Sequence, residues 1–85
     1  MNERAFVILV GGLMHGTRTL VPLALERMTL ASRRGEPIEY VRRLTRTGLV
    51  DGRSTAVALF APESVTEMEF DVLAADAIRD RDARH

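Results

Sequence analysis

The segment Ala5-Phe-Val-Ile-Leu-Val10 is apolar at every position and rich in β-branched residues. A strand with one solvated face alternates apolar and polar residues, whereas a continuous apolar run indicates a strand that is covered on both faces. The whole chain has 85 residues, which is enough for one domain with one core. We therefore expect a single domain, residues 1–85, built around this central strand.

Turn-forming residues divide the following chain into further strands. The glycine-rich turn Gly11–Gly16 follows the first strand, and Thr17–Val21 alternates as a returning strand does, which predicts a hairpin. Asp51-Gly52 predicts a second hairpin, between strands near Tyr40–Arg46 and Thr55–Phe60, because both central positions of a type I′ turn require positive φ. The sheet is expected to occupy about residues 5–61.

Residues 22–34 fit two structures. Pro22 at a first helical position, apolar residues at helical spacing and a glycine stop indicate a helix. The alternative pairs a strand at Arg27–Ala31 with one at Ile38–Arg42, across the turn Ser32–Pro37 in which glycine and proline supply the turn chemistry. Local propensity alone favours the helix.

A helix is predicted over about residues 65–81, after Ala61-Pro62 ends the sheet. Both Ser64-Val-Thr-Glu67 and Thr66-Glu-Met-Glu69 match the capping-box pattern at its start. At about 100° per residue, the helix carries two apolar stripes on roughly opposite sides. One stripe can cover the sheet, and the sequence does not identify which. The stripes are Val65, Met68, Val72 and Ala75, and Phe70, Leu73 and Ala77.

The charges are balanced overall but divided along the chain. All twelve basic residues are arginine and twelve residues are acidic, so the formal net charge is zero. Residues 1–61 carry nine arginines and five acids, and residues 62–85 carry three arginines and seven acids, which gives +4 and −4. We interpret this division as two parts that pack together and neutralise each other. The exclusive use of arginine indicates the coding bias of a GC-rich genome.

The order of turns resembles a family of small uncharacterised proteins of actinobacteria and their tailed phages. Gly11-Gly-Leu-Met-His-Gly16 stands where those proteins have a Gly-Gly-Pro-Leu-Asp-Gly turn, although Met14 and His15 depart from the usual Leu-Asp. The resemblance continues in Gly35-Glu-Pro37, in Tyr40-Val-Arg42 and in the Thr66-x-x-Glu69 helix start. It implies a small antiparallel sheet and no established activity.

The resemblance decides our expectation for the ambiguous segment, which we predict to be a strand at residues 27–31. The predicted fold is therefore α+β, a small antiparallel sheet of four or five strands with one C-terminal helix packed on it. Phage origin is also implied by the resemblance alone.

Patterns that would support catalysis or ligand binding are weak. The Gly11–Gly16 turn lacks the Lys-Ser/Thr pair that a P-loop places at the start of a helix. His15 has no recognisable serine or cysteine nucleophile beside it, and a turn explains Asp51 fully. With no cysteine and only two histidines, neither a disulfide framework nor a zinc site is expected. We predict a non-enzyme without catalytic, cofactor-binding or metal-binding residues.

The function we expect is that of a non-catalytic protein-interaction protein that binds a host protein or itself. The surplus of apolar surface predicts a twofold homodimer, since large apolar patches on soluble monomers mark interfaces. The predicted interface is the helix or the sheet face that the helix leaves uncovered. On the helix we expect first Phe70, Leu73 and Ala77, or failing that Val65, Met68 and Val72.

The alternative is a nucleic-acid-binding protein that contacts phosphates through arginines in the middle of the chain. One tyrosine and three phenylalanines provide few side chains for base stacking. No membrane partner is expected, because the apolar run is too short to span a bilayer, and the N-terminus lacks signal-peptide features, which predicts a cytoplasmic protein. The candidate anion-binding residues are Arg33, Arg34, Arg42, Arg43, Arg46 and Arg53.

Overall fold

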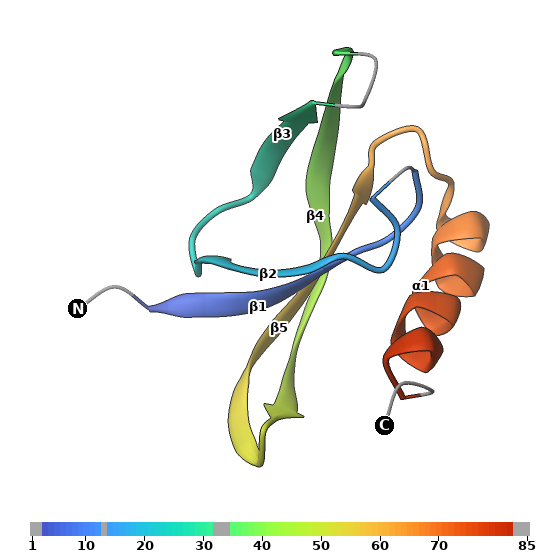
Figure 1. Cartoon of the computed structure of the whole chain (residues 1–85). Coiled ribbons are helices and arrows are strands. Elements are labelled where there is room, and N and C mark those ends of the chain that lie inside the picture. Colours follow the sequence, from blue (N-terminus) through green and yellow to red (C-terminus); the bar gives the residue numbers. More distant parts are fainter. Residues whose placement is uncertain (1–2, 13, 32–34, 83–85) are drawn as a thin grey trace.

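The structure is a computed structural model that describes residues 3–12, 14–31 and 35–82. Five strands precede one helix, which confirms the α+β class and the single C-terminal helix. Figure 1 shows a long β4–β5 hairpin crossed by β1 and β2, with the helix on one side. The elements are β1 (Arg4–Leu9), β2 (Arg18–Pro22), β3 (Arg27–Ala31), β4 (Pro37–Val50), β5 (Arg53–Pro62) and α1 (Glu67–Asp82).

The sheet is mixed, so the prediction of a purely antiparallel sheet was wrong. Its strand order is β2-β1-β5-β4-β3. The pairs β1–β2, β3–β4 and β4–β5 are antiparallel, but β1 runs parallel to β5, with Phe6 opposite Val57 and Leu9 opposite Phe60. Apolar alternation indicates which residues share a face of the sheet, but it does not indicate the direction of the neighbouring strand. The parallel pairing of β1 with β5 therefore cannot be predicted from this pattern.

The sheet is curled because of how its two edges are connected. Strands β2 and β3 lie at opposite edges, yet only residues 23–26 join them. Four strand spacings of a flat sheet amount to about 19 Å, and five extended residue steps reach only about 17 Å. The connection is also shortened by a turn, in which the Leu25 N–H donates to the Pro22 carbonyl at 3.0 Å. A flat sheet is therefore excluded.

One half of the core fills the inside of this curl. Arg42 holds the β2–β3 connection in place: its guanidinium donates to the carbonyl of Leu23 at 2.6 Å and to that of Leu25, and it lies over the Phe60 ring at 5.5 Å from the centroid. The backbone N–H of Arg42 also donates to the Glu26 carbonyl at 2.8 Å. The buried residues of this half are Ala5, Val7, Leu9, Val21, Tyr40, Ala58 and Phe60.

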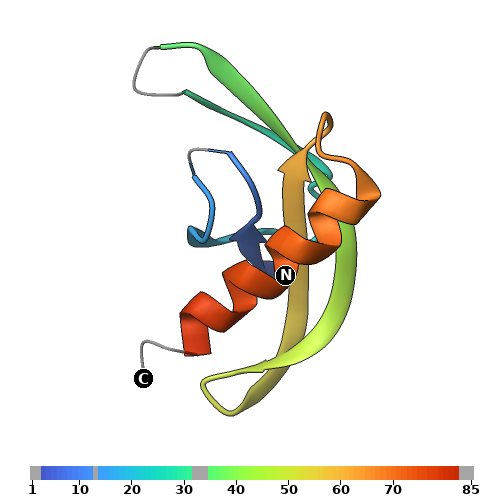
Figure 2. The ribbon, with the colours of Figure 1, turned by 90° about the vertical axis from the view of Figure 1, so that its right-hand side faces the viewer.

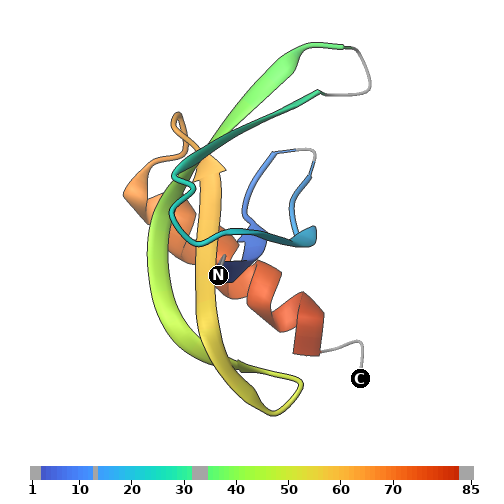
Figure 3. The ribbon, with the colours of Figure 1, turned by 90° about the vertical axis from the view of Figure 1, so that its left-hand side faces the viewer.

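The other half of the core lies between the sheet and α1. Figures 2 and 3 view the molecule from opposite sides: α1 crosses in front of β5 in one, and the β2–β3 connection crosses in front of it in the other. Both faces of β1 are thus covered, as the apolar run predicts. The buried residues of this half are Ile8, Val10, Leu59, Ala61, Phe70, Ala74 and Ala77.

The predicted hairpins are confirmed, with changes in extent. Residues 27–31 form β3 and pair with β4, as the resemblance implied, while residues 32–34 of the intervening turn lie outside the described residues. The two strands predicted at Ile38–Arg42 and Tyr40–Arg46 are parts of one continuous strand, β4. Asp51 and Gly52 have φ values of 53° and 79°, which is the backbone expected of a type I′ turn.

Candidate interaction surface

The start of α1 is fixed by one of the two predicted capping boxes. The Thr66 N–H donates to Glu69 Oε1 at 3.0 Å, and the Glu69 N–H donates to Thr66 Oγ1 at 3.2 Å. Hydrogen bonding of the carboxylate by the Thr66 backbone, and next by the Thr66 side chain, holds the pKa of the Glu69 carboxyl below its ordinary value. The cap sets where the helix begins, and the packing of Phe70, Ala74 and Ala77 on the sheet sets which side chains point away from it.

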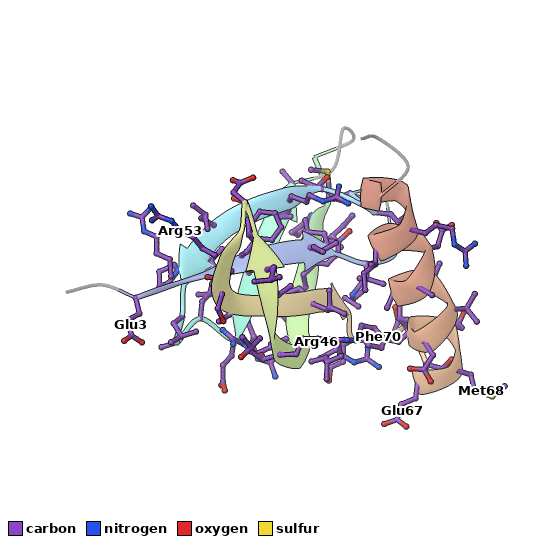
Figure 4. The ribbon with its side chains drawn as sticks, turned by 90° about the horizontal axis from the view of Figure 1, so that it is seen from below. Glu3, Arg46, Arg53, Glu67, Met68 and Phe70 are labelled. Carbon is purple, nitrogen blue, oxygen red and sulfur yellow. The ribbon has the colours of Figure 1, made fainter. Side chains whose placement is uncertain are left out.

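Met68 and Val72 point away from the sheet and stand in solvent. Their exposed fractions are 83% and 70%, and Figure 4 shows Met68 directed outward while Phe70 is directed toward the sheet. With Glu69 and Leu73, they line a shallow hollow along the helix that is largely open to solvent. We call the exposed side chains of Met68 and Val72, with this hollow, the outer face of α1.

The opposite stripe is used by the core. Phe70 and Ala77 are buried against the sheet, and Leu73 is partly buried there. Val65, from the stripe of Met68 and Val72, is also partly buried against this half of the core. Of the two alternative interface sets, the first therefore faces the sheet within one molecule. The second set supplies the exposed pair, Met68 and Val72.

The glycine-rich turn is attached to α1 through His15. Its Nδ1 accepts the Gly11 N–H at 2.8 Å, and its Nε2 lies 3.0 Å from Asp76 Oδ2. Because Nδ1 is an acceptor, the neutral ring carries its proton on Nε2 and donates it to Asp76. Both ring nitrogens are thus engaged within the molecule, and His15 here acts as a link between the turn and the helix.

Tyr40 holds the same turn from inside the curl. Its hydroxyl donates to the Gly11 carbonyl at 2.9 Å, and burial raises its pKa above the ordinary value, opposed by a hydrogen bond with the backbone of Met14. A Cβ on Gly12 would lie 2.7 Å from this hydroxyl, so only glycine fits here. The sequence does not predict the role of Tyr40, because nothing local to this residue indicates a contact with Gly11, which lies far away along the chain.

The candidate anion-binding arginines do not form one surface among the described residues. Arg33 and Arg34 lie outside those residues. Arg42 holds the β2–β3 connection, and Arg43 donates to the Pro62 carbonyl at 3.2 Å and lies 5.1 Å over the Phe70 ring. The two exposed members, Arg46 and Arg53, lie on different sides of the molecule (Figure 4).

The described part of the chain contains neither a cluster of metal ligands nor a helix that could span a membrane. In residues 3–12, 14–31 and 35–82, no three histidine or acidic side chains gather as a metal site would require. Within those ranges there is also no helix with the length and apolar character needed to cross a bilayer.

Comparison of the chain with protein-family models, with curated protein sequences and with solved structures finds no match.

Proposed function

We propose that this chain is a non-catalytic protein-interaction domain that binds a partner protein through the outer face of α1. The observation that carries the proposal is that Met68 and Val72 stay exposed although the core of the molecule is closed without them. An apolar side chain in water contributes little to folding, whereas its burial against a partner contributes roughly 1.5–3 kcal/mol. Methionine also adapts its shape readily to a partner surface.

The surroundings of the outer face indicate the chemistry of the partner. Acidic residues flank the exposed pair on both sides of the helix: Glu67 and Asp71 on one and Glu69 and Asp76 on the other. A partner that fits would present an apolar centre with a rim of arginine or lysine. If the chain is phage-encoded, as the resemblance of its turns implies, this partner is a host protein in the host cytoplasm.

Comparative capture tests the proposal. The wild-type chain, the double variant Met68→Ser/Val72→Ser and the control Leu20→Ser would be immobilised and exposed to extract of the cell in which the protein is expressed. Leu20 is a comparable exposed apolar residue on β2, with 56% exposure, and lies outside the outer face. All three proteins would first be shown to unfold at similar denaturant concentrations.

We expect a discrete set of proteins that the wild type and Leu20→Ser retain and the double variant loses. Equal retention by all three chains would contradict the proposal. Retained nucleic acid, released as salt concentration rises and unaffected by the double variant, would instead favour the arginine-mediated alternative.

A further inference from the structure

Strand β4 has an open edge along its second half. Its first part, Pro37–Val41, pairs with β3, and a register shift between Arg42 and Leu44 then marks a β-bulge. A bulge bends its strand away from the neighbour, and β3 pairs no further. From Leu44 to Val50, β5 is the only strand in the described part of the chain that pairs with β4.

The turn geometry shows which backbone groups face outward at this edge. Val50 and Arg53 flank the two-residue turn and form a hydrogen-bonded pair, and such pairs alternate along an antiparallel ladder. Leu44, Arg46 and Gly48 therefore bond to β5. The N–H and C=O groups of the residues between them point away from β5, and these residues are Thr45, Thr47 and Leu49.

This edge has little protection against pairing with another strand. It lacks proline, two of its three outward-facing residues are β-branched threonines, and Leu49 is 71% exposed. Protected edges carry charges or bulges that block an incoming strand. Here the bulge precedes the open stretch, and Arg46 is the only charged side chain between Leu44 and Val50.

We propose that two copies of this chain pair antiparallel through the open edges of β4, with Thr47 on the twofold axis. In this register Thr47 faces Thr47 of the second copy, and Thr45 faces Leu49 of the second copy. Each outward-facing residue then meets another one, so their backbone groups can bond to each other. The pairing joins two five-stranded sheets into one, and it uses a different surface from the outer face of α1.

The side chains favour this register over its neighbours. Leu44 meets Val50 of the second copy, and Arg46 meets Gly48 of the second copy. A shift of the second copy in one direction would place Arg46 of one copy opposite Arg46 of the other. This like-charge pair disfavours the contact. A shift in the other direction would place Thr45 opposite Asp51 in the turn and lose backbone bonds.

The shape of the surface next to Gly48 also suits the same register. Gly48 has no side chain and lines a hollow of about 170 Å³ with Arg46 of its own copy and with Leu49, Val57 and Ile78. The aliphatic stem of Arg46 from the second copy can lie over Gly48, where no side chain stands in its way.

Substitution of Thr47 tests the pairing, because Thr47 lies on the twofold axis and any new side chain there faces the same side chain of the second copy. Thr47 is exposed, so Thr47→Glu and Thr47→Lys should both fold. Each variant alone should raise the dimer dissociation constant by about tenfold, and an equimolar mixture should restore the dimer as a Glu–Lys heterodimer. The matched control is the same pair of substitutions at Ser54, an exposed residue one strand away from the edge.

Sedimentation of the full chain gives the readout. We expect the wild type and both Ser54 variants at twice the 9.5 kDa monomer mass, with dissociation confined to the separate Thr47 variants. A wild type that stays monomeric across the micromolar range would overturn the proposal. So would a dimer that both Thr47 variants leave intact, or a mixture that fails to reassociate.

Discussion

Tyr40 is the residue that joins the glycine-rich turn to the inside of the curled sheet. Its hydroxyl reaches the carbonyl of Gly11, 29 residues away in sequence, and its side chain is fully buried. A buried carbonyl that loses its donor carries the desolvation cost without compensation. The Tyr40 hydroxyl therefore holds the turn from inside the curl, and His15 holds it from the side of α1.

The substitution Tyr40→Phe should lower the free energy of unfolding by about 1–3 kcal/mol at neutral pH, because it leaves buried backbone groups of the turn without a partner. Urea denaturation followed by circular dichroism measures this change. A Tyr40→Phe chain as stable as the wild type would show that the hydroxyl does not hold the turn.

The same residue predicts a loss of stability at high pH. Burial raises the pKa of Tyr40 above its ordinary value of 10.0, so the folded state retains the proton more strongly than the unfolded state. The contribution of the protonated Tyr40 hydroxyl to the free energy of unfolding is complete below pH 10.0. It is lost as the pH rises through the higher pKa of the folded state. The chain has one tyrosine and neither lysine nor cysteine, so no other side chain titrates near this pH.

The free energy of unfolding should therefore fall with rising pH above this point in the wild type and stay flat in Tyr40→Phe. Urea titrations at a series of alkaline pH values provide the measurement. Parallel curves for the two proteins would refute the assignment.

At the scale of elements, the β4–β5 turn is the position where backbone geometry alone should decide stability. Gly52 has φ of 79°, and a Cβ there would meet no atom within 4 Å, so a substitution adds strain but no clash. We expect Gly52→Val to destabilise the domain by about 1–2 kcal/mol, since a β-branched residue tolerates this backbone poorly.

Asparagine adopts positive φ more readily, so Gly52→Asn is the matched control and should lose much less stability. Denaturation midpoints of the two variants are the comparison. Identical midpoints for Gly52→Val and Gly52→Asn would show that backbone strain at this turn does not determine the stability.

The elements that could be predicted from the sequence are those with a local signal. Asp51-Gly52 defines its turn through the backbone that it requires, and Thr66 with Glu69 defines the helix start through reciprocal hydrogen bonds. Strand β3 carries a weaker signal, because its sequence has helical spacing as well. Pairing with β4 overrides that local preference, and no property of residues 27–31 alone contains this information.

At the scale of the whole molecule, the sequence left two features undetermined. The parallel pairing of β1 with β5 depends on strand direction, and the curl depends on a short connection between opposite edges. The placement of the two helix stripes depends on both. Once the sheet is curled and α1 lies across β1 and β5, Phe70 is inside and Met68 and Val72 are outside.

The central claim is that the outer face of α1 binds another protein. A photo-crosslinking residue in place of Val72 tests it most directly in the cell in which the protein is expressed, with the exposed Thr29 on β3 as the control position. We expect the label at position 72 to form a discrete adduct between this chain and another protein, and the label at position 29 to form none. No adduct from position 72, or the same adducts from both positions, would contradict it.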